Sequence, residues 1–129
     1  MTKKIIAVAG ATGAQGGGLV RSILADPDGE FAVRAITRDP DSPKARALAA
    51  AGAEVVAADI ADVAAVARAF DGAYGAYCVT FFWNHFSPDQ ERAEAHALAD
   101  AAKQAGVQHV VWSTLEDSRR FVKLEDARM

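Results

Sequence analysis

The 129-residue chain is long enough for one domain with a single hydrophobic core, since 51% of its residues are hydrophobic. Its 14 basic and 17 acidic residues are evenly spread and give a net charge of −3, which argues against a surface for nucleic acid or an anionic membrane. We therefore expect a small-molecule site in a protein that has neither of those partners.

The lone Cys78 lies in an apolar run and cannot form an internal disulfide. The first residues, Met1 to Lys4, open directly into an apolar run without a signal peptide. No apolar stretch reaches the roughly 18 residues that a membrane helix requires. Together these features predict a reduced, cytoplasmic protein.

The first apolar run, residues 5–9, breaks into glycines spaced Gly10-x-x-Gly13-x-x-Gly16. This pattern is typical of a strand that turns into a helix around a phosphate, because backbone N–H groups hold a pyrophosphate only where no Cβ blocks its approach. Gly10 would permit the tight turn, Gly13 the approach of the phosphate, and Gly16 close helix-to-strand packing. A glycine-rich turn without a ligand is the alternative, but glycines in a first helical turn cost stability and favour a ligand.

Beyond this turn, apolar runs alternate with Ala-rich helical stretches, which is typical of a parallel sheet. The further expected strands are residues 31–37, 54–58, 73–80 and 107–113. The helices between them begin at polar caps, which are Ser42 before Pro43, Asp62, and Ser87 in a capping box with Gln90. They end at Gly52, at Asp71-Gly72 and at Gly106.

Two of these helices carry an apolar stripe at helical spacing. The expected stripes are Val63, Val66 and Phe70 in the third helix, and Ala95, Leu98, Ala99 and Ala102 in the longest one. The longest helix, from Ser87 to Ala105, would also offer a surface for a homodimer.

Five strands joined by right-handed crossovers predict an α/β fold, a doubly wound parallel sheet of order 3-2-1-4-5. The ligand crevice would lie at the carboxyl ends of the first and fourth strands. Functional residues should therefore cluster after the five strand ends, which are Ala9, Thr37, Ala58, Thr80 and Ser113. From Glu116 to Met129, eight of fourteen residues are charged and no stop signal appears. We therefore expect a fold truncated after its fifth strand, with residues 1–129 forming the N-terminal part of a longer dinucleotide-binding domain.

Five segments of the sequence carry a family resemblance: Gly10-Ala11-Thr12-Gly13-Ala14-Gln15-Gly16-Gly17, Thr37-Arg38-Asp39-Pro40, Gly52-Ala53-Glu54-Val55-Val56, Asp71-Gly72-Ala73-Tyr74, and Val110-Val111-Trp112-Ser113-Thr114-Leu115-Glu116. From Lys4 to about Asp117, the chain resembles the NmrA-like family, an atypical branch of the short-chain dehydrogenase/reductase superfamily with a Rossmann fold. The resemblance implies NADP(H) binding. Some members of that family are redox-sensing regulators of protein partners and others are reductases.

The cofactor can also be argued from the end of the second strand, where a protein contacts the adenosine ribose. A carboxylate there suits the 2′-hydroxyl of NAD, whereas a guanidinium suits the 2′-phosphate of NADP. Arg38 comes first after the strand and Asp39 second, so we expect NADP (NADPH) rather than NAD. Arg38 as a solvated charge, with Asp39 beginning a turn before Pro40, is the alternative. Lys44 would either add to the phosphate pocket or be an ordinary surface lysine.

The expected cofactor-binding residues are Gly10, Ala11, Thr12, Gly13, Ala14, Gln15, Gly16, Arg38, Asp59, Thr80, Phe81 and Phe82. The resemblance implies that Asp59 accepts from the adenine amino group, and a loop acid near a helix start is the alternative. It also implies that residues 80–82 lie against the ribose and nicotinamide of the cofactor. The alternative is a plain apolar lid, which would contain the same residues. At Ser113, related reductases carry a catalytic hydroxyl, although a lone serine there is more often structural.

No catalytic residue can be assigned from the sequence. Reductases of this superfamily usually pair a tyrosine with a lysine four positions on, which lowers the pKa of the phenol. Here the residue four positions after Tyr74 is Cys78, and the residue four positions after Tyr77 is Phe81. The usual position of the pair falls near or beyond Met129. The three histidines lack metal-ligand spacing, so no metal is expected, and no Gly-x-Ser-x-Gly motif supports a hydrolase.

Two functional classes follow from these observations. The favoured one is an NADP(H)-binding redox sensor or regulator in which the cofactor reshapes a surface for a protein partner. The alternative is an NADPH-dependent reductase of quinones or similar carbonyl substrates.

Overall fold

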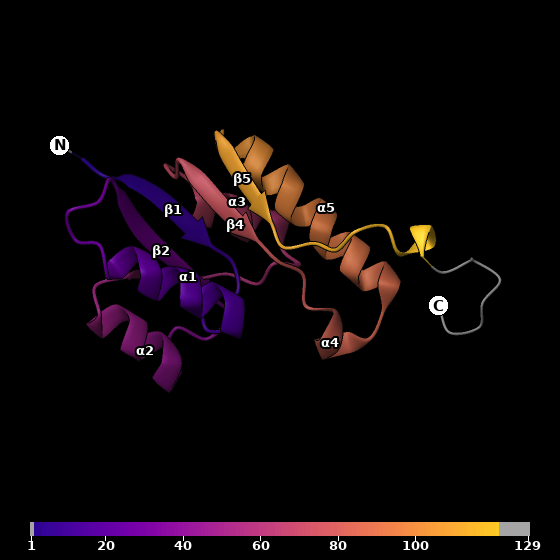
Figure 1. Ribbon diagram of the computed structural model, residues 1–129, viewed down its shortest axis with the longest axis horizontal. Coiled ribbons are helices and arrows are strands. Elements are labelled where there is room, and N and C mark those ends of the chain that lie inside the picture. The colour runs from indigo at the N-terminus through magenta and orange to yellow at the C-terminus, as the bar shows by residue number, and fades with distance from the viewer. Residues whose placement is uncertain (1, 122–129) are drawn as a thin grey trace.

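A computed structural model describes residues 2–121 as a five-stranded parallel sheet of order β3-β2-β1-β4-β5 with helices on both faces (Figure 1). The strands are β1 (Lys4–Val8), β2 (Phe31–Thr37), β3 (Glu54–Ala57), β4 (Gly75–Cys78) and β5 (His109–Trp112). The helices are α1 (Ala14–Leu24), α2 (Pro43–Ala50), α3 (Val63–Phe70), α4 (Phe82–His85) and α5 (Pro88–Gln104). The predicted fold class and strand order are confirmed.

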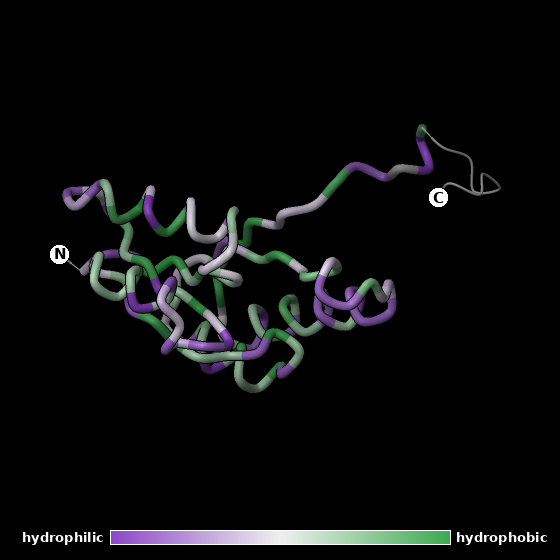
Figure 2. The backbone as a smooth tube through the Cα atoms, turned by 90° about the horizontal axis from the view of Figure 1, so that it is seen from below, coloured by the Kyte–Doolittle hydropathy of each residue, from purple (hydrophilic) through white to green (hydrophobic). Residues whose placement is uncertain are grey.

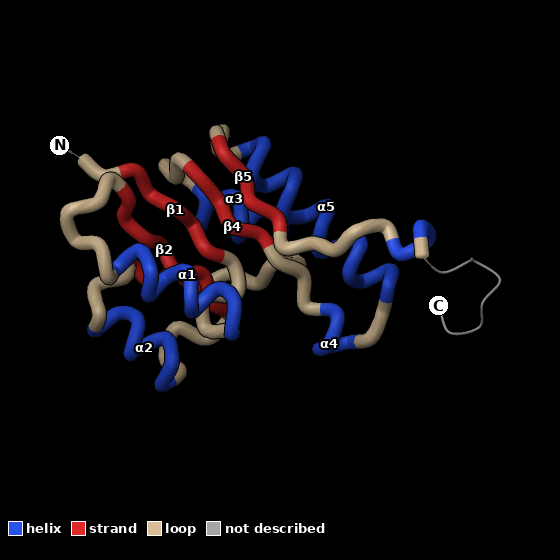
Figure 3. Tube along the Cα trace, in the orientation of Figure 1, coloured by secondary structure: helices blue, strands red, loops and turns tan. Residues whose placement is uncertain are grey.

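The sheet separates two hydrophobic cores. Helices α1 and α2 cover one face and α3 and α5 the other (Figures 1 and 3). Val8 and Val20 are fully buried in the core under α1 and α2, while Phe70 and Leu98 are fully buried in the core under α3 and α5. The sheet is therefore covered on both sides near β1, as its near-continuous apolar strands require.

Local signals account for most helix boundaries. Ser42, Asp62 and Ser87 accept the backbone N–H three residues on, at 3.1–3.2 Å, and so cap α2, α3 and α5. Only half of the predicted capping box forms, because the Ser87 N–H donates to His85 Nδ1 rather than to the Gln90 side chain. Glycines at the predicted stops have positive φ, namely Gly52, Gly72 and Gly106.

Some predicted boundaries and faces are corrected. Strands β4 and β5 are shorter than expected, because their paired residues run only from Gly75 to Cys78 and from His109 to Trp112. The first strand begins one residue early, at Lys4. In α5 the predicted stripe is shifted, since Ala99 is exposed and the buried residues are Glu94, Ala97, Leu98, Ala101 and Ala102. The stripe of α3 is confirmed at Val66 and Phe70.

After β5 the described chain leaves the sheet and runs away from it to a short 3-10 helix, η1 (Ser118–Arg120) (Figure 2). Residues 122–129 lie outside the described residues, and so does the usual position of the superfamily's Tyr-Lys pair, near or beyond Met129. None of the helices in residues 2–121 is long and apolar enough to cross a membrane.

Cys78 illustrates how the core controls reactivity. Its side chain is fully buried, and this burial raises the pKa of the thiol to about 11. Because the thiolate is the reactive form, we expect native protein at pH 8 to resist iodoacetamide, whereas protein in urea should be alkylated rapidly. Mass spectrometry over time would measure both rates, and equal rates with and without urea would contradict the prediction.

Candidate functional site

The turn between β1 and α1 leaves backbone donors free. Gly10 has a φ of 62°, and a Cβ at Gly16 would lie 2.8 Å from the carbonyl carbon of Gly10, so both positions require glycine. Gly13 is the N-cap of α1 and provides no side-chain cap. No acceptor within residues 2–121 takes the N–H groups of Ala14 and Gln15. These donors point out of a helix N-terminus, which is where an anion binds favourably.

Beside this turn lies a cavity of about 640 Å³ at the carboxyl ends of β2 and β3. Its walls come from the glycine turn, these two strand ends, the start of α2, and the β4–α4 connection. The lining residues are Gly10, Thr12, Gly13, Ile36, Thr37, Arg38, Asp39, Ser42, Pro43, Lys44, Ala58, Ile60, Phe81 and Asn84. The cavity has the volume of a cofactor site. It lies mainly at the ends of β2 and β3 and reaches the predicted crevice, at the ends of β1 and β4, only through Gly10 and Phe81.

The charges at the cavity favour a negatively charged ligand. Arg38 and Lys44 both line it, and neither forms an ion pair within the described part of the chain. Asp39 also lines it, but its Oδ1 accepts the Asp41 N–H at 3.0 Å. Asp39 therefore begins a turn, as the alternative interpretation held, while Arg38 stays at the cavity.

The structure brings together five of the predicted site residues at this cavity: Gly10, Thr12, Gly13, Arg38 and Phe81. The Phe81 ring lies against the glycine turn, where its Cζ would be 2.9 Å from a Cβ on Gly10. Ala11 and Ala14 line a neighbouring hollow of about 420 Å³ between α1 and α2. Thr12, Gly13 and Lys44 line both hollows, so the two adjoin at the glycine turn.

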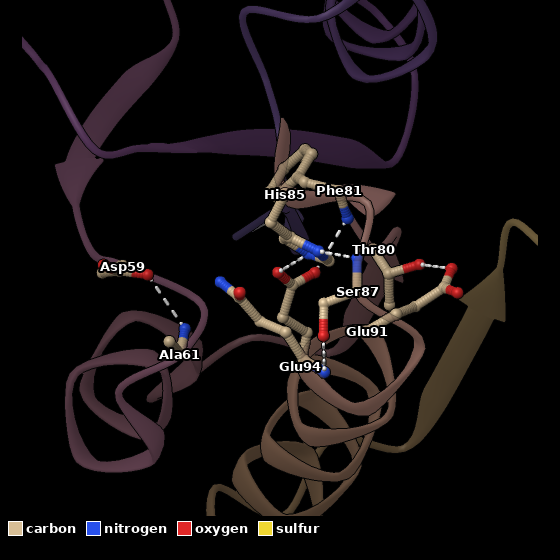
Figure 4. A network of polar contacts seen from close by, with 9 residues as sticks. Asp59, Ala61, Thr80, Phe81, His85, Ser87, Glu91 and Glu94 are labelled. Atoms are coloured by element: carbon tan, nitrogen blue, oxygen red, sulfur yellow. Dashed lines mark hydrogen bonds and ion pairs between the residues drawn. The ribbon is translucent and has the colours of Figure 1, made fainter. Parts of the chain in front are cut away.

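The other predicted residues lie elsewhere. Asp59 lines a smaller adjacent pocket of about 160 Å³, and its Oδ1 accepts the Ala61 N–H at 2.9 Å (Figure 4). The Thr80 hydroxyl donates to Glu91 on α5 at 2.8 Å, and Phe82 stacks edge-on against Trp83 within α4. Gly16 packs under the turn, and the Gln15 side chain lies on its β4 side.

A buried carboxylate that the sequence analysis missed holds the wall of the cavity in place. Glu94 on α5 is 5% exposed and accepts the Phe81 N–H at 2.8 Å and His85 Nε2 at 2.7 Å (Figure 4). Because His85 Nδ1 accepts the Ser87 N–H at 3.0 Å, the proton of the neutral ring is on Nε2. The available signal was an acidic residue on the apolar face of α5, four residues before Leu98.

Within residues 2–121, no group of three or more His, Cys, Asp or Glu side chains is arranged so that it could hold a metal ion. His96 lies exposed on α5, and His109 begins β5.

A doubly wound parallel sheet with a glycine turn and a cavity at its strand ends defines the class of Rossmann-type nucleotide-binding proteins. The sequence profile of the NmrA-like family matches residues 2–127, and the chain belongs to this family. The resemblance read from the sequence is thereby confirmed.

Three known proteins illustrate the likeness. The NmrA-like family domain-containing oxidoreductase FrzB of Cladobotryum sp is 45% identical over 114 residues, which is 85% of this chain and 33% of the relative. The NADPH-dependent quinone oxidoreductase QOR2 of Escherichia coli, solved with NADPH, has a TM-score of 0.69 and 33% identity over 85% of this chain and 36% of that one. NmrA, a negative transcriptional regulator solved with NADP and with NAD, has a TM-score of 0.79 and 30% identity over 95% and 37% of the two chains.

The chain thus spans about a third of the length of the curated relatives that it matches. The prediction that residues 1–129 are one dinucleotide-binding domain of a longer fold stays a prediction.

Proposed function

We propose that this chain binds NADP(H), with the pyrophosphate on the glycine turn and the adenosine end in the adjacent cavity. The observation that carries the proposal is that uncapped helix donors adjoin a cavity of about 640 Å³ with two unpaired cations among its described residues. The likeness to QOR2, solved with NADPH, and to NmrA, solved with NADP, supports the same cofactor.

The preference for NADP over NAD would rest on Arg38 and Lys44. Both line the cavity from the end of β2 and the start of α2, where the ribose 2′-phosphate would lie. Asp39, which would favour NAD, has an oxygen engaged by its own loop. A guanidinium can form paired hydrogen bonds with a phosphate, whereas the hydroxyl of NAD gives it little to bind.

Substituting Arg38→Ala is expected to weaken NADPH binding about 10- to 100-fold, since a hydrogen bond to a charged group contributes about 1.5–3 kcal/mol. NADH binding should change little, because NADH lacks the 2′-phosphate. Calorimetric titration of the 129-residue chain with both cofactors would measure this. Arg46→Ala on the exposed surface of α2 is the matched control and should leave both affinities unchanged. Equal affinity of the unsubstituted chain for NADPH and NADH would contradict the proposed role of Arg38.

The role of the bound cofactor has two candidates. A reductase is supported by the likeness to NmrA-like oxidoreductases at up to 45% identity and to the quinone oxidoreductase QOR2. A redox sensor or regulator, which the sequence analysis favoured, is supported by the likeness to the regulator NmrA. We favour the reductase, because the oxidoreductase FrzB is 45% identical to this chain, whereas the regulator NmrA is 30% identical. NADPH oxidation by a quinone in a full-length protein would support it, whereas binding without turnover would support the sensor.

A further inference from the structure

Arg38 lies on the wall between the cavity and a smaller pocket beside it. The pocket has a volume of about 160 Å³ and lies between the end of β3 and the start of α5. The two hollows share the lining residues Arg38, Ile60, Phe81 and Asn84. We refer to the smaller one as the carboxylate pocket, because Asp59 and Glu94 both line it. The long Arg38 side chain can turn its guanidinium toward either hollow without movement of the backbone.

The two carboxylates of this pocket differ in how fully they are engaged. Both Glu94 oxygens accept hydrogen bonds, Oε2 from the Phe81 N–H and Oε1 from His85 Nε2 (Figure 4). Asp59 uses Oδ1 for the Ala61 N–H and forms no ion pair within residues 2–121. Asp59 is therefore the carboxylate of the pocket that is able to attract a further cation.

Arg38 is the cation that shares the carboxylate pocket with Asp59. Its guanidinium forms no ion pair in the described part of the chain, so no fixed contact holds it at the cavity. The other charged residues of the cavity, Asp39 and Lys44, act on the guanidinium from the cavity side. Asp59 attracts it from the opposite side. The pocket is small compared with the screening length of about 8–10 Å in physiological salt, so this attraction persists there.

We propose that Asp59 competes with the cofactor for Arg38 and thereby limits the preference of the site for NADP over NAD. This inference rests on the proposed NADP(H) binding. A 2′-phosphate in the cavity must draw the guanidinium away from the carboxylate pocket, whereas the 2′-hydroxyl of NAD leaves it there. Asp59 is thus a positioning residue that lowers the affinity for NADP alone. The adenine contact that the family resemblance implies for Asp59 would instead affect both cofactors equally.

The test measures NADPH and NADH binding to Asp59→Asn by calorimetry. Asparagine removes the charge but keeps Oδ1 as an acceptor for the Ala61 N–H, so the loop keeps its hydrogen bond. NADPH is expected to bind about 2- to 5-fold more tightly, as befits the loss of one exposed charge pair, and NADH should bind as before. Asp41→Asn is the matched control, because Asp41 is exposed beside the same strand end and lines neither hollow. It should change neither affinity.

The double variant Arg38→Ala/Asp59→Asn shows whether Asp59 acts through Arg38. If it does, Asp59→Asn has no effect on NADPH binding once the guanidinium is gone. A gain that persists without Arg38, or that also appears for NADH or in Asp41→Asn, would reveal general charge repulsion and overturn the inference. No change would overturn it too, and a loss for both cofactors would assign Asp59 to adenine instead. If the unsubstituted chain binds no NADPH, the proposed function itself fails, and this result is distinct from the others.

Discussion

Gly16→Ala is expected to lower the free energy of unfolding by about 3 kcal/mol, near the upper end of the usual cost of overpacking. The added Cβ would lie 2.8 Å from the carbonyl carbon of Gly10 and closer still to its oxygen. Gly10 has little room to yield, because the Gly13 N–H donates to its carbonyl at 2.9 Å and the Phe81 ring lies against its Cα. Urea unfolding followed by circular dichroism would measure the change.

Gly18→Ala is the matched control in the same helix. No atom lies within 4 Å of a Cβ built at Gly18, so the methyl group fits without strain. Alanine is the better helix former by about 0.5–1 kcal/mol, and the variant should be more stable than the unsubstituted chain. If Gly16→Ala lowers the free energy of unfolding and Gly18→Ala raises it, the Gly16 effect can be attributed to the contact with Gly10. Loss of stability in both variants would contradict that assignment.

NADPH binding by the same two variants tests the role of the glycine turn in the proposed cofactor site. A Cβ at Gly16 can be accommodated only if α1 and the turn move apart, which displaces the free N–H groups at the helix N-terminus. We therefore expect Gly16→Ala to weaken NADPH binding at least about 10-fold, since two or more charge-assisted hydrogen bonds would be misplaced. Gly18→Ala should bind NADPH as the unsubstituted chain does.

The features predicted correctly from the sequence are those with local causes. The caps at Ser42, Asp62 and Ser87 and the positive φ of Gly10 depend on residues within three or four positions. The strand order follows from connection length and handedness, which repeat along the chain. Such signals can be recognised in a single sequence because no distant partner is needed to interpret them.

The features that were missed depend on residues far apart in the chain. Gln15 meets Tyr77 and Ser113 across 62 and 98 residues, and nothing near Gln15 in the sequence identifies either partner. Arg34 in β2 has the sequence context of a strand residue, yet it donates to the carbonyl oxygens of Ala69 and Asp71 at the end of α3. Periodicity assigns a residue to a face but does not identify its partner.

The short helix α4 was missed for a related reason. Its four residues include Phe82 and Trp83, whose aromatic character is equally compatible with a lid or a strand end. The helix ends at His85, and its C-cap residue, Phe86, has a φ of 55° although it is not glycine. The interactions of Glu94 with Phe81 and His85 hold this segment, and they become visible only when α5 is packed against the sheet.

Glu94→Leu is therefore expected to be the second strongly destabilising substitution, with a loss of about 3 kcal/mol in the free energy of unfolding. Leucine fits the apolar face of α5 but leaves the part-buried Phe81 N–H and His85 Nε2 without an acceptor, and each donor shielded from water in this way costs about 1–3 kcal/mol. Glu94→Gln keeps one acceptor oxygen and should cost about half as much. Asp100→Leu, at an exposed position of the same helix, should change stability by less than about 0.5 kcal/mol.

NADPH binding provides a second measurement for these variants. Phe81 and Asn84, on the segment that Glu94 holds, line the cavity beside the glycine turn. Glu94→Leu should thus weaken NADPH binding even under conditions in which the variant remains folded, whereas Asp100→Leu should not. Calorimetric titration well below the unfolding midpoint separates lost binding from lost folding. If Glu94→Leu were destabilised but bound NADPH normally, Glu94 would stabilise the fold alone, and the β4–α4 connection would have no part in holding the cofactor.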